Sequence, residues 1–171
     1  MNFYLQKLRD NLAQAIEGLT DEHLASHPEG KWCVAEILEH LYLTYTGTIK
    51  GLERCLAAGK PLARSSTLKD RLQCLVVIGC GYLPDGRKAP QPTTPKGLPP
   101  AQVRTEIFSC IAEMDALIDR AIRTYGVDAR LLDHPIIGPL RGSQWCKFHW
   151  IHGRHHIRQI DRLRNFASSR V

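Results

Sequence analysis

The sequence of 171 residues predicts an all-α protein, an antiparallel four-helix bundle with minor extra helices. Three observations lead to this fold class. Apolar residues recur every three or four positions in four long segments, as on one face of a helix. Proline, glycine and helix-capping residues separate those segments. No segment alternates apolar and polar residues in the way a half-buried strand does. We expect a single domain over residues 1–171.

The first half of the chain contains two of the main helices. The first is predicted from residue 3 to about Gly18, with its apolar positions at Phe3, Leu5, Leu8, Leu12, Ala15, Ile16 and Leu19. Thr20 is a capping residue that begins one further short turn. A loop follows, and the second main helix is predicted from Trp32 to about Ala58, where Gly59 and Pro61 end it.

The second half contains a minor helix and the other two main helices. A third, shorter helix is predicted over residues 68–79. Residues 81–100 hold most of the prolines and form a long surface connection, since proline cannot continue a helix. A fourth helix runs from Pro100 to about Tyr125. A turn-rich connector occupies residues 134–140, and Ser143 is the predicted N-cap of a last helix from Gln144 to about Ala167.

Composition excludes several classes of protein. The 43% hydrophobic and 23% charged content is ordinary for a globular domain. No apolar run approaches the roughly 20 residues that cross a bilayer, and the N-terminus lacks the basic start and apolar block of a signal peptide. We therefore expect a cytoplasmic protein with no membrane partner. The six cysteines have no CxxC spacing, so no zinc knuckle or redox motif is indicated, and we expect them to be buried.

The net charge of +6 raises the question of an anionic partner. Arg154, Arg158 and Arg162 recur every fourth residue and form a basic stripe on the last helix. Such a stripe is most often a solvated helix face. No basic platform interleaved with aromatic residues accompanies it, so nucleic acid is not the expected partner.

Histidines gather on the last helix, at positions 149, 152, 155 and 156. His152 and His156 are four residues apart and therefore lie on one face, which is the inward, mostly apolar face of this helix. Two imidazoles at this spacing can share one metal ion, and His40 on the second helix could supply a third ligand. Eight histidines also produce such a spacing by chance, and an inward histidine is often only a hydrogen-bonded core residue, so both interpretations remain open.

A site of three imidazoles has a defined chemistry. Neutral imidazoles suit Zn²⁺, Ni²⁺, Cu²⁺ and Fe²⁺ and leave positions open. A water bound there would be acidified toward neutral pH, and a thiolate could bind instead. We expect the second ring nitrogens to donate to outer partners, with Glu36, Glu39 and Gln159 as candidates. Gly47 and Gly51 are expected to let a second helix approach His40 or to leave a cavity beside it.

Two segments resemble a known superfamily. The segment Trp32-x-Val34-Ala35-Glu36-Ile37-Leu38-x-His40-Leu41 resembles the second-helix signature of the DinB-like metal-binding superfamily. The sequence His-Pro-Ile-Ile-Gly-Pro-Leu at 134–140, with the later Trp145, His152, His155-His156 and Gln159, is similar to one branch of it, whose function is unknown. The chain departs from the pattern at Cys33, where a Ser or Thr cap is usual, and in the longer segment 81–100.

The resemblance implies an up-down-down-up four-helix bundle that holds a divalent metal (Zn, Ni or Fe) on His40, His152 and His156. His149 and His155 are not implied as ligands. It also implies a metal-dependent enzyme of the thiol S-transferase or hydrolase type, with a low-molecular-weight thiol as substrate, and association into a homodimer. The alternative is a non-catalytic metal-binding or dimeric structural protein. An open coordination position would favour the enzyme.

Overall fold

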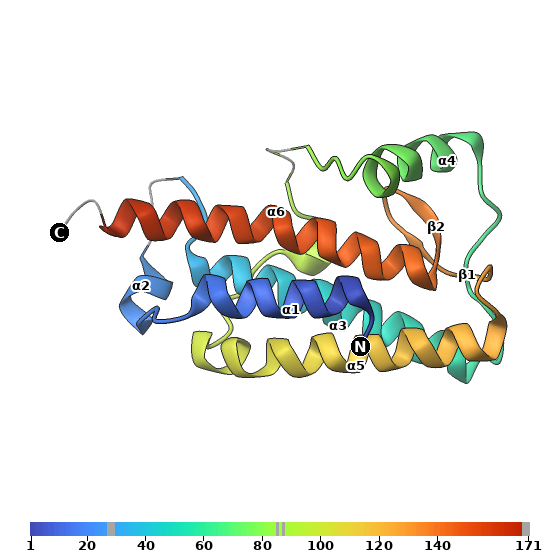
Figure 1. Cartoon of the computed structure of the whole chain (residues 1–171), viewed down its shortest axis with the longest axis horizontal. Helices are drawn as coiled ribbons and strands as arrows, with labels where there is room; N and C mark the ends of the chain where they lie inside the picture. The colour runs from blue at the N-terminus through green and yellow to red at the C-terminus, as the bar shows by residue number, and fades with distance from the viewer. Residues whose placement is uncertain (27–29, 85, 87, 169–171) are drawn as a thin grey trace.

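The protein is mostly helical, as predicted, and it also contains a small two-stranded sheet (Figure 1). The computed structural model describes residues 1–26, 30–84, 86 and 88–168. Its elements, in chain order, are α1 (Phe3–Ile16), α2 (Asp21–Ala25), α3 (Val34–Ala57), α4 (Leu68–Cys74), the π-helical turn η1 (Leu75–Gly79), the 3-10 turn η2 (Gln91–Thr93), α5 (Pro100–Tyr125), β1 (Arg130–His134), β2 (Gly138–Arg141) and α6 (Gly142–Ser168).

The four long helices α1, α3, α5 and α6 lie lengthwise beside one another, whereas α4 packs against β2 and η1 packs against α6 (Figure 1). Helix α3 packs along α5, and α1 packs along α6. Each contributes fully buried side chains to one hydrophobic core, such as Leu8, Tyr45, Met114 and Ile160. As a result, α3 and α6, which carry the histidines of interest, both line the same hydrophobic core.

A two-stranded antiparallel sheet joins α5 to α6, so the expectation that the chain has no strand is wrong. Leu132 lies opposite Leu140 and His134 lies opposite Gly138, with an irregularity in register between Arg130 and Leu132. The strands bury consecutive residues and do not alternate between inside and outside. The period of two that marks a half-buried strand is therefore missing from the sequence.

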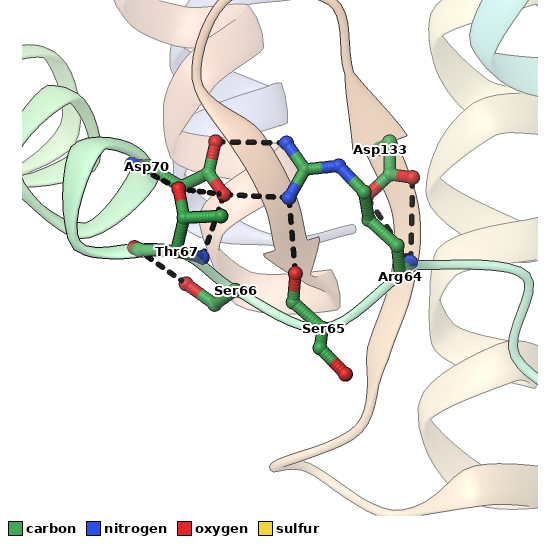
Figure 2. Close-up of polar contacts among 6 residues, drawn as sticks. All are labelled: Arg64, Ser65, Ser66, Thr67, Asp70 and Asp133. Carbon is green, nitrogen blue, oxygen red and sulfur yellow. Dashed lines mark hydrogen bonds and ion pairs between the residues drawn. The ribbon is translucent and has the colours of Figure 1, made fainter.

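The carboxylate of Asp70 in α4 is the centre of a hydrogen-bonded network with the residues that precede this helix (Figure 2). The Arg64 guanidinium donates to both Asp70 oxygens at 2.7 and 2.9 Å, and the backbone N–H and hydroxyl of Thr67 donate to Oδ2 at 2.8 and 2.7 Å. These donors hold the pKa of Asp70 well below its usual range. The backbone N–H of Arg64 also donates to Asp133 of β1, so one short segment ties α4 to the sheet.

Most predicted boundaries lie within a few residues of the observed ones. Helix α3 begins directly after Cys33 although cysteine is a poor cap, because the Glu36 carboxylate accepts a hydrogen bond from the Cys33 N–H at 2.9 Å. The predicted helix over 68–79 changes to a π-helical turn after Cys74. Of the cysteines, Cys80 is exposed and departs from the predicted burial. None of the helices in the described chain is long and apolar enough to span a membrane.

Candidate metal centre

His40 from α3 and His152 and His156 from α6 come together inside the helical assembly. The Nε2 atom of His152 lies 3.2 Å from Nε2 of His40 and 3.1 Å from Nε2 of His156. His40 and His156 are buried, whereas His152 is partly exposed. The three ligand atoms lie within 4.8 Å of one another. The structure thus juxtaposes the three residues that the sequence singled out.

The outer hydrogen bonds fix where the ring protons sit. Nδ1 of His40 lies 2.8 Å from the Thr93 carbonyl oxygen, which can only accept, so this nitrogen carries the proton. Nδ1 of His156 lies 2.8 Å from Oε1 of Gln159 and is likewise the donor. In the neutral rings, both Nε2 atoms therefore present a lone pair toward His152. A proton on His152 Nε2 could satisfy only one of them.

A metal ion fits this arrangement of lone pairs. Metal–imidazole bonds of about 2.0–2.1 Å separate two ligand nitrogens by roughly 2.9 Å at right angles and roughly 3.4 Å at the tetrahedral angle. The observed separations of 3.1 and 3.2 Å lie between these values. The outer partners of His40 and His156 are a carbonyl and an amide oxygen, which commonly orient metal-bound imidazoles. Donor type, spacing and protonation all suit a divalent transition metal.

Burial keeps these imidazoles neutral. It lowers the pKa of His156 to about 3, and it lowers the pKa of His40 against a smaller opposing effect of the hydrogen bond to Thr93. The pKa of His152 falls well below its ordinary value, because of burial and of the neighbouring rings. A metal binds only neutral imidazole, so no proton has to leave these three rings at neutral pH.

The proline-rich connection is part of the site, which the sequence did not reveal. The carboxylate of Glu39 is buried and accepts three backbone N–H bonds, from Lys96 at 2.7 Å, Gly97 at 3.0 Å and Leu98 at 3.1 Å. The neighbouring His40 donates to Thr93 in the same connection. Two consecutive residues of α3 thus hold the segment that supplies an outer partner of the site. The only sequence signal was an acidic residue on an otherwise apolar helix face.

The remaining residues around the triad orient the rings by packing. The indole of Trp32 lies against His40, with ring centroids 5.3 Å apart. Phe148 stacks on His152 at 5.5 Å with nearly parallel planes. The His155 ring packs edge-on against His156, with centroids 5.0 Å apart, and its Nε2 lies 3.1 Å from Nε2 of Gln159. Among the predicted outer partners, Gln159 therefore contacts a candidate ligand, Glu39 fixes the connection, and Glu36 caps α3.

The glycines near His40 play a different part from the one predicted. Gly47 has no neighbour within 4 Å of an added Cβ, and Gly51 packs against Leu132 of β1 and not against a helix. The close helix approach occurs instead at Gly153 of α6, where a Cβ would collide with the Leu8 side chain of α1. Gly153 is next to His152 in the sequence, and its lack of a side chain allows α6 to approach α1 closely at this point.

His149 is a buried histidine outside the triad. It is fully enclosed, its ring packs against Tyr45 at 5.4 Å and stacks on Trp145 at 5.7 Å, and among the described residues neither ring nitrogen has a hydrogen-bond partner. Burial, with a smaller contribution from His134, lowers the pKa of His149 to about 3. The folded protein therefore keeps this ring neutral under conditions in which the unfolded chain would protonate it.

This difference predicts a loss of stability in acid. Between pH 7.5 and 5.5 the unfolded chain takes up a proton on His149 and the folded chain does not, so stability falls as the pH falls, by about 1.4 kcal/mol for this residue. His149→Phe should remove that part of the pH dependence in metal-free protein, as measured by urea unfolding at both pH values. An equal loss in the variant and the wild type would contradict the assignment.

Comparison with known proteins supports a family assignment. The family model described as "Protein of unknown function (DUF1569)" matches residues 3–162. No curated protein matches the chain, and no solved structure does either. The DinB-like relationship stays a prediction. Because the family match extends over nearly the whole sequence, including all three histidines of the triad, this chain belongs to the DUF1569 family.

Proposed function

We propose that this protein binds one divalent transition metal, of the Zn, Ni or Fe type, through Nε2 of His40, His152 and His156. The observation that carries the proposal is the convergence of three neutral imidazoles whose outer hydrogen bonds turn the Nε2 lone pairs of His40 and His156 toward His152. Without a cation, a proton on His152 Nε2 could pair with only one of these lone pairs, and the other would stay unpaired in a buried site, at a cost in free energy.

The site would leave room for a small molecule. Within the described chain, the metal-ligand group consists of three histidines and no fourth histidine, cysteine or carboxylate. The nearby Glu39 carboxylate is engaged by three backbone amides and is not free to complete it. A divalent metal with an open position acts as a Lewis acid that lowers the pKa of a bound water or thiol.

We also infer that the chain is a distant DinB-like protein, with the up-down-down-up order of that four-helix bundle. The support is the position of the three histidines, one on α3 and two at a spacing of four on α6. On this basis we propose a metal-dependent enzyme of the thiol S-transferase or hydrolase type that acts on a low-molecular-weight thiol. A homodimer in the cytoplasm would be consistent with the same relationship.

Cobalt substitution tests whether the open position accepts a thiol. We expect Co²⁺-loaded protein to show ligand-field bands and to gain a near-ultraviolet thiolate-to-cobalt charge-transfer band when a small thiol is added. An alcohol of the same size should not produce this band, because a neutral hydroxyl is a poor ligand at neutral pH. His152→Ala should lack both signals.

The result separates the enzyme from a purely structural metal site. Ligand-field bands that are insensitive to thiols and to other small anions would show a closed centre and would remove the catalytic part of the proposal. Absence of any cobalt spectrum in the wild-type protein would remove the metal site itself.

A further inference from the structure

A second site lies on the outer face of α6, away from the histidine triad. A cavity of about 390 Å³ is lined by residues of α4, η1, the sheet and the start of α6. This volume falls in the range of about 300–1,000 Å³ that is usual for small-molecule sites. Its lining includes the apolar side chains of Leu75, Ile78 and Pro139.

The polar part of this cavity is strongly basic. Its lining contains four cationic side chains, from Arg71, Arg130, Arg141 and Lys147. The single acidic residue of the lining is Asp70, whose charge is already paired with Arg64 outside the lining (Figure 2). An incoming anion would therefore meet an excess of positive charge that Asp70 does little to cancel.

The sheet places two of these cations in an unfavourable arrangement. Arg130 and Arg141 are directly opposite each other in the register of β1 and β2. Like charges at opposed positions of a ladder destabilise the pair. Asp128 pairs with Arg141 at 3.0 Å, but within the described residues no carboxylate forms an ion pair with Arg130, Arg71 or Lys147. An anion bound between the strands and α4 would relieve this repulsion.

The start of α6 adds to the attraction for an anion. This helix of 27 residues begins at Gly142, and its first turns contribute Gln144 and Lys147 to the lining. The positive end of the helix dipole therefore lies at the cavity. Three cations that have no ion-pair partner in the described part of the chain, together with a helix start, suit a doubly charged group with several acceptor oxygens better than a single carboxylate.

We propose that the cavity between α4, β2 and the start of α6 binds the phosphate group of a small organic phosphate, with Arg71, Arg130 and Lys147 as the principal contacts. The phosphate would sit against the basic wall, and the organic part would cover Leu75, Ile78 and Pro139. This site is separate from the metal centre, because its lining contains none of the three histidines, and Gln144 and Lys147 precede His152 on α6 by about 12 and 7.5 Å along the helix axis. Its existence does not depend on metal binding.

The test measures anion binding by calorimetry with metal-free protein, using inorganic phosphate, phenyl phosphate and benzoate as probes. We expect both phosphates to bind at one site per chain, phenyl phosphate more tightly, and benzoate more weakly than either. Arg130→Ala should weaken phosphate binding about tenfold or more, since it removes charged hydrogen bonds. Arg130→Lys should retain part of the affinity.

Matched variants keep the result interpretable. Arg120→Ala on α5 removes the same charge from an exposed position outside the cavity and should leave phosphate binding unchanged. His152→Ala should also bind phosphate normally, which separates this site from the metal centre. Phosphate should raise the melting temperature of the wild type but not that of Arg130→Ala.

Three outcomes would overturn the proposal. One is equal weakening in Arg120→Ala and Arg130→Ala, which would show only general charge screening. Another is loss of phosphate binding in His152→Ala. The third is an oligonucleotide that binds through Arg130 and is not displaced by phenyl phosphate, which would make this surface a nucleic-acid contact.

Discussion

His152→Ala should abolish stoichiometric metal binding. His152 lies between the other two histidines, with its Nε2 at 3.2 Å from that of His40 and 3.1 Å from that of His156. Its loss therefore removes the central ligand and leaves only two. Loss of an outer partner of a metal ligand already costs about 10–100-fold in affinity, and loss of a ligand should cost more. Elemental analysis of untagged, reconstituted protein should find one ion per wild-type chain and almost none in the variant.

Two further variants calibrate this result. His23→Ala changes an exposed histidine on α2 and should keep the full metal content. Gln159→Leu removes the outer partner of His156, and its metal content should lie between those of His23→Ala and His152→Ala. Metal at 100 times its dissociation constant should stabilise the wild type by about 2.7 kcal/mol, or roughly 5–10 °C, and should not stabilise His152→Ala. Equal metal content in His152→Ala and the wild type would refute the assignment of the triad.

Gly138→Ala is expected to be strongly destabilising. Gly138 begins β2 with a φ of +80°, and an added Cβ would lie 2.5 Å from Cγ and Oδ1 of Asp70. A left-handed conformation alone costs an L-residue about 1–2 kcal/mol. In addition, Asp70 would have to move away from Arg64 and Thr67, which would loosen α4 from the sheet. The backbone conformation alone should lower the melting temperature of metal-free protein by roughly 2–8 °C, and the displacement of Asp70 should lower it further.

Gly47→Ala provides the matched control. This glycine lies inside α3, and nothing lies within 4 Å of an added Cβ. The same substitution should therefore stabilise the protein by about 0.5–1 kcal/mol, since alanine is the better helix former. If both variants changed the melting temperature in the same direction, the steric role of Gly138 beside Asp70 would be wrong.

The helices and the triad were accessible from the sequence because both depend on local periodicity. Apolar residues at helical spacing marked α1, α3, α5 and α6, and a spacing of four placed His152 and His156 on one face. That His40 lies near His152 and His156 was expected partly from the motif resemblance and partly from its position on the inward face of its helix.

The parts that escaped prediction depend on contacts between distant segments. The strands β1 and β2 bury consecutive residues, so their sequence lacks alternation. The bonds from Glu39 to the backbone of residues 96–98 span almost sixty positions in the sequence. Nearly every residue type has a backbone N–H, so the sequence does not indicate which residues donate. The basic cavity likewise gathers residues from α4, the sheet and α6, and only the register of the sheet reveals that Arg130 faces Arg141.

The shared attachment of residues 93–98 to Glu39 and His40 has a thermodynamic consequence. The two side chains are neighbours on one turn of α3, so the conformation of that connection and the orientation of the His40 ring are linked. Linkage is reciprocal: whatever binds and orders the connection would tighten metal affinity, and the metal would raise the affinity for that molecule by the same factor. A proline-rich segment, with little conformational entropy to lose, is well suited to transmit such coupling at low cost.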